Sequence, residues 1–406
     1  VAENLFIDEL PKNKAGAVDY SFMHDQAQKR LTELGMDVSP RAIVDTLPMG
    51  VRQTVEIAKA LMMDAEIILF DEPTTSLSHK EKEHLFGVIR SLKQKGVTVI
   101  YISHILEDVF LLCDRVSVLR DGAMVATIDR SELSKDDIVS LMVGRALENV
   151  YPTVEKEIGG VLFEADGISV PPAIKNVSMK LRRGEILGIF GLMGAGRTEL
   201  ARALYGLDRI ASGSLRLSGS ALDNPTPEKC IGRGMAFITE DRRKEGLLMP
   251  KPVEDNLILV KLTDIMTKLG VVRRREVSRI SDDLIRRLSI KVSDKRLQHA
   301  ANLSGGNQQK VVIGKWLCKN PRMLIMDEPT RGVDVGAKYE IYALIQDLAK
   351  QGSGILFISS EMEELMGICD RILVMKNGEL SGELMKGEYD PKKIMYYALT
   401  GGNGNA

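Results

Sequence analysis

The sequence predicts an α/β protein whose mostly parallel sheet carries helices on both faces, and it predicts this fold twice. Three observations support this prediction. Short, continuous apolar runs of strand length recur between charged or glycine residues, as is typical of parallel strands that are buried on both faces. One such run leads through a glycine-rich loop into a helical pattern. Separate blocks of sequence also recur along the chain with one constant spacing.

Composition narrows the class of protein. The chain has 406 residues, 44% of them hydrophobic, which is enough for two or three domains with sizeable cores. Its 55 Lys plus Arg residues balance 56 Asp plus Glu residues, which argues against a protein that mainly holds nucleic acid. No apolar run approaches the ~18 residues that span a bilayer. The four cysteines are far apart, without a zinc or disulfide spacing, which favours a reducing cytoplasmic compartment.

The constant spacing reveals a duplicated domain. Three blocks recur without gaps at an offset of 256 residues (327 − 71 = 256). They are D-E-P-T (71–74 and 327–330), C-D-R (113–115 and 369–371) and a Leu and Gly three residues apart (47–50 and 303–306). Val1 to Leu5 resembles Val253 to Leu257 at an offset of 252, so a length difference of four residues follows. Cys113 and Cys369 therefore occupy equivalent positions, for which we expect core packing.

The two copies are unequal. The second extends upstream from Val253 to about Val161, a further 92 residues (253 − 161 = 92) that the first copy lacks in this chain. We therefore expect a first domain at 1–150 without its N-terminal ~90 residues, which would include its phosphate loop. A linker at 151–160, a complete second domain at 161–400 and a flexible tail at 401–406 follow. The chain is thus predicted to be N-terminally incomplete.

The predicted strands and one helix follow from these patterns. The apolar runs form matching pairs in the two copies, and a helix is expected after the glycine-rich loop. The expected strands are 67–70, 97–102, 186–190, 323–326 and 355–358, and the expected helix is 198–207.

The loop between the strand at 186–190 and its helix is a candidate phosphate-binding loop. It matches the pattern G-x-x-x-x-G-K-S/T except that Arg197 replaces the lysine. Gly191, Gly194 and Gly196 let backbone N–H groups converge on phosphates, and the helix N-terminus adds positive potential. The hydroxyl of Thr198 is a candidate ligand of Mg²⁺. An ordinary glycine-rich turn is the alternative, which the strand–loop–helix context disfavours; efficient hydrolysis with an arginine at this position is not expected.

Two pairs of acids end the strands of the repeated D-E-P-T block. Asp71 and Asp327 lie at the carboxyl ends of buried strands, where an acid that coordinates Mg²⁺ belongs in a nucleotide-binding fold. Glu72 and Glu328 follow directly and are candidates to polarise an attacking water molecule. A single pair could merely end a strand, but its repetition favours a functional role.

A second glycine motif begins the next helix of the second copy. Ser304 is a good N-cap, and Gly305 and Gly306 offer exposed amides at the helix start, with Gln309 following. The motif lies only 23 residues before Asp327 (327 − 304 = 23), too close to be a second phosphate loop.

The order of these motifs resembles that of an ABC transporter ATPase domain. In particular, the chain resembles the double-domain ATPase of bacterial monosaccharide importers, the ribose, galactose and xylose group, over essentially its whole length. The segments 194–200, 239–243 and 327–337 are similar to that group's second domain. The resemblance implies ABC-type nucleotide-binding domains with additional helical and antiparallel β subdomains.

The resemblance also implies that ATP is sandwiched between the phosphate loop of one domain and the L-S-G-G motif of the other. One composite site would use Asp71, Glu72 and His104, facing the motif at 304–306. Its elements are intact, but its phosphate loop would precede Val1.

The other composite site would use the loop at 191–198 with Asp327 and Glu328, facing residues 47–53. There Pro48 replaces the capping serine, Met49 replaces a glycine, and Ser360 stands where a histidine is expected. Glu240 also takes the place of a usual glutamine. This site is therefore predicted to bind ATP rather than to turn it over.

The implied function is that of the ATP-hydrolysing subunit of a sugar importer. It would be peripheral at the cytoplasmic face of the bacterial cell membrane and dock on transmembrane permease subunits through helical subdomains at 1–46 and 253–302. A periplasmic or extracellular sugar-binding protein would act through the permease, and no nucleic acid is expected. Two alternatives stay open: a non-hydrolysing nucleotide-binding fragment, and a soluble twin ABC ATPase on ribosomes or DNA.

Overall fold

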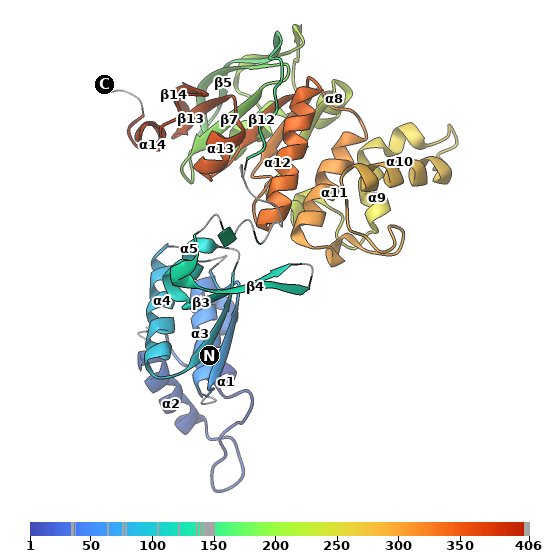
Figure 1. Cartoon of the computed structure of the whole chain (residues 1–406). Coiled ribbons are helices and arrows are strands. Elements are labelled where there is room, and N and C mark those ends of the chain that lie inside the picture. Colours follow the sequence, from blue (N-terminus) through green and yellow to red (C-terminus); the bar gives the residue numbers. More distant parts are fainter. Residues whose placement is uncertain are drawn as a thin grey trace. The chain divides into compact units, whose positions relative to one another are not determined.

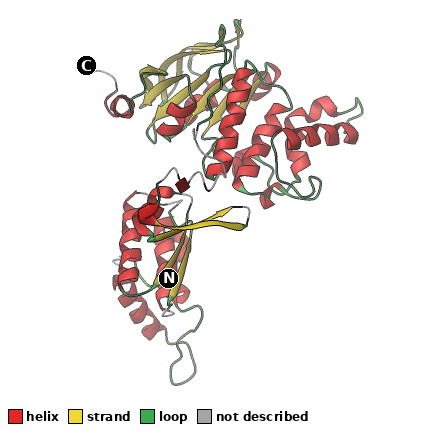
Figure 2. Ribbon diagram, viewed as in Figure 1, coloured by secondary structure: helices red, strands yellow, loops and turns green. Residues whose placement is uncertain are grey.

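A computed structural model describes residues 1–33, 36, 38–62, 65–74, 77, 79–103, 105–120, 122–134, 137–138, 141 and 151–401. The chain divides into two compact units, Val1–Ala146 and Leu147–Ala406 (Figure 1). Each unit is an α/β structure of its own (Figure 2). Among the described residues, no helix is both long enough and apolar enough to cross a membrane.

The first unit carries two small sheets. Its elements are α1 (Ala2–Leu5), α2 (Tyr20–Glu33), η1 (Val44–Thr46), α3 (Met49–Met62), β1 (Ile67–Asp71), α4 (His79–Gln94), β2 (Thr98–Ile102), α5 (Leu106–Leu112), β3 (Arg115–Arg120), β4 (Ala123–Asp129) and η2 (Arg130–Glu132). Strands β1 and β2 are parallel, with Ile67 opposite Thr98, and β3 and β4 form an antiparallel hairpin.

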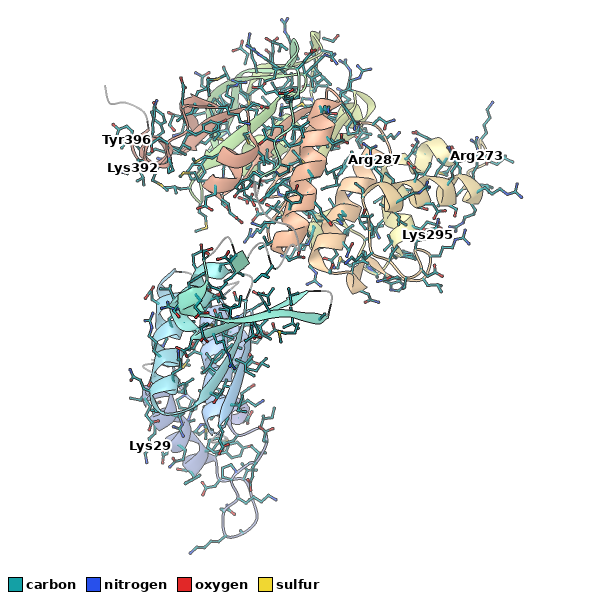
Figure 3. All side chains as sticks on the ribbon, in the orientation of Figure 1. Lys29, Arg273, Arg287, Lys295, Lys392 and Tyr396 are labelled. Carbon is teal, nitrogen blue, oxygen red and sulfur yellow. The ribbon has the colours of Figure 1, made fainter. Side chains whose placement is uncertain are left out.

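The second unit begins with a β-rich part and a helical part. The β-rich part contains β5 (Val161–Val170), β6 (Ile174–Arg182), β7 (Ile186–Gly191), α7 (Arg197–Leu204), β8 (Ser212–Leu217), β9 (Ser220–Ala221), α8 (Pro227–Gly232) and β10 (Met235–Ile238). The helical part contains the π-helical turn η3 (Arg242–Gly246), α9 (Val253–Ile258), η4 (Leu259–Ile265), α10 (Arg274–Arg287) and η5 (Ala300–Asn302). Arg273, labelled at the start of α10 in Figure 3, has a side chain that is 54% exposed.

The rest of the second unit completes its main sheet. The elements are α11 (Gly305–Leu317), β11 (Met323–Asp327), α12 (Val335–Lys350), β12 (Gly354–Ile358), α13 (Met362–Ile368), β13 (Arg371–Lys376), β14 (Glu379–Met385) and α14 (Pro391–Thr400). Six strands pair in the order β10-β11-β12-β7-β13-β14, and all neighbours are parallel except β13 and β14. A separate antiparallel sheet has the order β6-β5-β8-β9. The predicted α/β class, with a mostly parallel sheet and an antiparallel subdomain, is confirmed.

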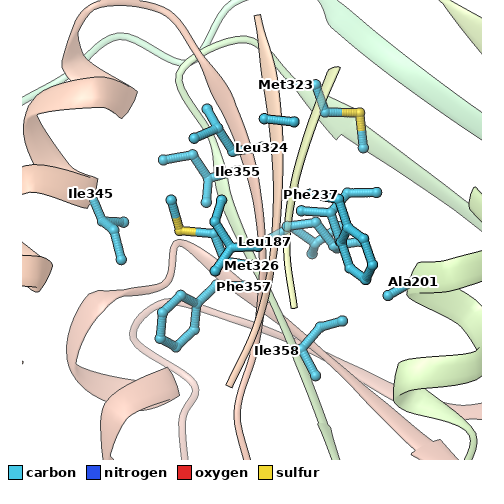
Figure 4. Packing of buried hydrophobic residues seen from close by; sticks show 14 of the residues in the cluster. Leu187, Ala201, Phe237, Met323, Leu324, Met326, Ile345, Ile355, Phe357 and Ile358 are labelled. Carbon is cyan, nitrogen blue, oxygen red and sulfur yellow. The ribbon is translucent and has the colours of Figure 1, made fainter. Parts of the chain in front are cut away.

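The core of the second unit covers both faces of the central strands. Figure 4 shows Phe357 of β12 on the same side as Ile345 of α12, whereas Ile358 lies on the other side, toward Ala201 of α7. Every residue of β7, β11 and β12 is buried. Continuous apolar runs in the sequence therefore correspond to strands that are covered twice.

The duplication extends to the secondary structure. Strands β1 to β4 and helices α4 and α5 each match an element of the second unit at the offset of 256. Earlier in the chain, α2 matches α10 at an offset of 254 (274 − 20 = 254). The length difference of four residues therefore falls in two steps of two, one before α2 and one between α2 and α3.

Strand β1 differs from its sequence prediction as a buried strand. Its residues alternate between exposed and buried, and Ile67 and Leu69 are 62% and 59% exposed. The equivalent Met323 and Ile325 are 0% exposed. In the second unit, β7 lies beside β12 and α7 lies over this face, and the described part of the first unit contains no equivalent of either element. Strand β1 therefore has the apolar residues of a strand that is buried on both faces, but one of its faces is exposed.

Two further features differ from expectation or extend it. The helix expected at 198–207 runs from Arg197 to Leu204, because Gly206 adopts a φ of +78° and lies too close to Pro225 for any Cβ. Residues 151–160, expected as a linker, lie within the second unit, where Lys156 forms an ion pair with Asp370 at 2.7 Å. Cys369 is fully buried and Cys113 is half-buried, and both thiols are free, as core packing predicts.

Candidate nucleotide-binding site

The phosphate-loop candidate joins β7 to α7, as predicted. Gly194 and Gly196 have φ values of +81° and +97°, which L side chains rarely adopt, and Gly196 caps α7. A Cβ on Gly191 would lie 2.8 Å from the carbonyl oxygen of Met375. These positions require glycine, and they leave backbone amides around the start of a helix, where anions bind.

Asp327 is a buried acid at the end of β11. It is 1% exposed, and neither carboxylate oxygen has a hydrogen bond of normal geometry to the described residues. Burial raises its pKa to about 6, although the Thr198 hydroxyl and the Arg197 guanidinium lower it. Buried oxygens of this kind call for a cation, so Asp327 and Thr198 fit a Mg²⁺ site. No cluster of three or more acidic, His or Cys side chains surrounds them in the described chain, so phosphate oxygens would have to complete the coordination.

Glu328 is held from two sides. Its Oε1 lies 3.2 Å from Nη1 of Arg197, and its Oε2 accepts a hydrogen bond of 3.1 Å from the Ser360 hydroxyl. Burial raises the pKa of Glu328, and the charge of Arg197 opposes this rise. Its φ of +46° is unusual for a residue with a side chain, and its N–H donates to the carbonyl of Ile358 at 2.9 Å. The position expected to carry a histidine thus supplies a serine that binds this carboxylate.

The glycine motif at the start of α11 has the capping geometry that the sequence predicts. The hydroxyl of Ser304 accepts a bond of 2.9 Å from the side-chain amide of Asn307. A Cβ on Gly305 would meet the Gly332 carbonyl at 2.8 Å, and one on Gly306 would meet Ala337 at 2.5 Å. The two glycines therefore also serve the packing of α11 against the loop that follows β11.

Gln309 of the same motif lies inside the unit. It is 2% exposed, and its Nε2 has no hydrogen-bond partner among the described residues. Its predicted contact with nucleotide would therefore require a ligand or a loop to approach this buried amide.

The segment 239–243 contains a link that sequence reasoning missed. Arg242 donates from Nη1 to the carbonyl of Arg331 at 2.6 Å and from Nη2 to that of Gly332 at 2.9 Å. Glu240 forms an ion pair with Arg331. These contacts join the segment to the loop after D-E-P-T. In the sequence, only the resemblance of the segment to a known family indicated that it is important.

The first unit repeats part of this arrangement. Asp71 ends β1 with an exposed side chain, and Glu72 has a φ of +49° with its N–H bonded to the Ile102 carbonyl at 2.9 Å. Pro48 precedes α3, so no hydroxyl is present where Ser304 caps α11. His104, the third residue assigned to this site, lies outside the described residues.

Sequence reasoning also missed a buried acid behind the loops of each unit. Glu364 on α13 is 1% exposed and Asp108 on α5 is 0% exposed. They accept hydrogen bonds from Thr330 and Thr74, the threonines of the two D-E-P-T blocks. The shared spacing of 256 residues (364 − 108 = 256) was the available signal.

A doubled P-loop fold with these motifs defines an ATP-binding cassette protein. The chain matches the ABC transporter family over residues 1–75 and 174–331, and it belongs to this family. A solved structure of MJ1267, an ATP-binding cassette of an ABC transporter, aligns with 59% of this chain and 99% of its own length, with a TM-score of 0.52 and 21% identity. That likeness supports the fold.

Curated relatives place the chain more narrowly. It is 43% identical to the galactose/methyl galactoside import ATP-binding protein MglA of Clostridium perfringens over 100% of this chain and 80% of the relative. It is 43% identical to the ribose import ATP-binding protein RbsA of Bacillus subtilis over 99% of this chain and 81% of the relative. A ribose import ATP-binding protein of Rubrobacter xylanophilus is 44% identical over 99% of this chain. The predicted resemblance to the ATP-binding subunits of sugar importers is confirmed.

Proposed function

We propose that this chain is the ATP-binding subunit that powers the uptake of a monosaccharide by an ABC importer. The observation that carries the proposal is the glycine loop between β7 and α7 beside the unpartnered Asp327. Relatives at 43–44% identity that are named for galactose and ribose import support the sugar class.

ATP would bind with its phosphates at the loop from Gly191 to Thr198. The backbone amides of the loop and the guanidinium of Arg197 would bind phosphate oxygens, and Thr198 and Asp327 would hold Mg²⁺. The cation would neutralise phosphate charge that these residues alone leave uncompensated.

We further propose that the two composite sites differ in role. Asp71 would hold Mg²⁺, and Glu72 and His104 would serve hydrolysis. The site with Glu328 would bind ATP with little turnover, because the carboxylate of Glu328 is already bound by Arg197 and Ser360 and is less able to polarise a water molecule. With a single phosphate loop, these 406 residues alone would bind ATP and hydrolyse it very slowly.

Partner binding would involve the helical part of the second unit. An apolar groove of about 240 Å³ lies there. Its apolar lining is Leu248, Ile258, Leu259, Leu262, Val272 and Val277. We propose that transmembrane permease subunits dock on this part, at the cytoplasmic face of the membrane, and that a sugar-binding protein acts through the permease.

Sugar uptake in cells tests the proposal. A strain without the gene is expected to lose uptake of one labelled monosaccharide among galactose, ribose and xylose. The wild-type gene is expected to restore uptake, and a gene that encodes Glu72→Gln is not. Unchanged uptake of all three sugars would argue against the proposed function, and sedimentation of the protein with polysomes or DNA would favour the soluble alternative.

A further inference from the structure

Glu364 lies behind the two loops that carry the candidate catalytic groups of the second unit. Four side chains donate hydrogen bonds to its carboxylate. They are Thr330 (2.8 and 2.9 Å), Ser359 (2.8 Å), Tyr342 (2.5 Å) and Lys338 (2.9 Å). Thr330 follows β11, Ser359 follows β12, and the other two donors lie on α12. The carboxylate thus joins both loops to two helices.

These loops meet at Glu328. Ser360, the neighbour of Ser359, donates to the carboxylate of Glu328, which itself lies two residues before Thr330. The left-handed backbone of Glu328 is strained and persists only where the surroundings hold it. Through Thr330, Glu364 fixes the loop that carries this strained residue, and through Ser359 it fixes the second loop, which contacts Glu328.

The first unit carries part of this arrangement. Asp108 accepts hydrogen bonds from Thr74 at 2.6 Å and from Tyr101 at 3.3 Å, and it forms an ion pair with Lys82. Lys82 and Lys338 are equivalent at the offset of 256. Glu72, like Glu328, has a positive φ. A buried acid therefore accompanies the strained glutamate in both copies.

The tyrosine that donates a hydrogen bond to the buried acid comes from a different element in each unit. In the first unit it is Tyr101 of β2, whose equivalent in the second unit is Phe357 (101 + 256 = 357). In the second unit it is Tyr342 of α12, whose equivalent in the first is Phe86 (342 − 256 = 86). The hydroxyl contact with the acid is retained although its position in the chain has changed. The contact itself, rather than the packing of one particular side chain, is the common feature.

We propose that Glu364 is a positioning residue that holds the loops after D-E-P-T and after the next strand in the geometry that meets the terminal phosphate of ATP, and that Asp108 holds the loop after D-E-P-T of the first unit in the same way. The inference rests on the proposed binding of ATP at the loop 191–198. Glu328 lies 3.2 Å from Arg197, which stands where the phosphate-loop lysine reaches the β- and γ-phosphates. A displaced Glu328 loop therefore affects ATP more than ADP, which lacks the γ-phosphate.

Calorimetric titration of the purified chain with Mg-ATP and Mg-ADP tests the proposal. Glu364→Ala is expected to lower the preference for ATP over ADP by about tenfold, while ADP affinity changes by less than about twofold. Ser359→Ala, which cuts the link to one loop, is expected to lower the preference by about threefold. Ser353→Ala is the matched control, since Ser353 precedes β12 at its other end and donates to the Pro321 carbonyl.

A rescue experiment separates the contact from general packing. Glu364→Asp shortens the acid to the length used in the first unit and is expected to lower the ATP preference. Adding Phe357→Tyr supplies the phenol from the position that Tyr101 occupies, and the preference is expected to recover.

Each other outcome is decisive. A preference for ATP that is unchanged in folded Glu364→Ala and Ser359→Ala overturns the inference, as does a parallel loss of ATP and ADP affinity. If Glu364→Ala does not fold, Ser359→Ala decides. A wild-type chain that binds neither Mg-ATP nor Mg-ADP refutes the proposed function itself, and the inference falls with it.

Discussion

Replacing Asp327 by asparagine is expected to stabilise the second unit while weakening its binding of Mg-ATP. Burial raises the pKa of this carboxyl from 3.8 to about 6. Since a tenfold change in proton affinity corresponds to ~1.4 kcal/mol, keeping the charge inside the fold costs about 3 kcal/mol above pH 6. The amide also lacks partners, which offsets part of the gain. We therefore expect Asp327→Asn to gain about 1–3 kcal/mol without nucleotide.

Thermal unfolding measured by calorimetry provides the readout. For a unit of this size, about 1–3 kcal/mol corresponds to a rise in melting temperature of about 3–10 °C. The folded pKa lies above the unfolded one, so the charge destabilises wild type above pH 6 and this penalty fades as the pH falls through 6 toward 4. The advantage of the variant is therefore expected to shrink over that window.

The first unit offers a matched control. Asp71 ends the equivalent strand with an exposed side chain, so Asp71→Asn is expected to leave the melting temperature unchanged. In parallel, Asp327→Asn is expected to lower Mg-dependent ATP affinity at least about tenfold, because a charged metal ligand is lost. A variant that melts at or below the wild-type temperature at pH 7.5, or whose difference from wild type is independent of pH, would refute the reasoning.

Four further variants test other residues. Thr198→Ala is expected to weaken ATP binding about tenfold in Mg²⁺ but little in EDTA, and equal affinities by calorimetry would remove the role given to its hydroxyl. Glu72→Gln is expected to abolish most ATP-driven sugar uptake in cells and Glu328→Gln to cost much less; equal losses would mean equivalent sites. Lys156→Ala is expected to lower the melting temperature of the second unit, because about 3 kcal/mol is lost when one partner of a buried ion pair is removed. An unchanged melting temperature would mean that residues 151–160 do not support this unit.

Much of the fold could be predicted because its signals are local. Strands β7, β11 and β12 of the main sheet are buried on both faces, and each therefore has a continuous run of mostly apolar residues in the sequence. The phosphate loop and the helix cap at Ser304 depend on glycines and a hydroxyl at fixed spacing, which the sequence shows directly. Because the two copies are related by a constant offset of 256, Asp71 and Asp327 could also be predicted to occupy equivalent positions.

The features that escaped prediction depend on what lies across the fold. The open face of β1 is as apolar as that of a covered strand, and only the absence of covering elements among the described residues distinguishes it. The pairing of Arg197 with Glu328 joins two segments that are 131 residues apart (328 − 197 = 131). Glu364 and Asp108 resemble ordinary surface acids in sequence, and their burial is set by helices that pack from elsewhere.

The most direct test of the account is the stoichiometry of nucleotide binding to the purified chain. Titration calorimetry with Mg-ATP is expected to give one nucleotide per chain, bound at the loop that ends in Thr198, with affinity reduced by Thr198→Ala and by Asp327→Asn but not by Asp71→Asn. Absence of ATP binding, or binding that none of these substitutions affects, would contradict the assignment of this loop as the ATP site.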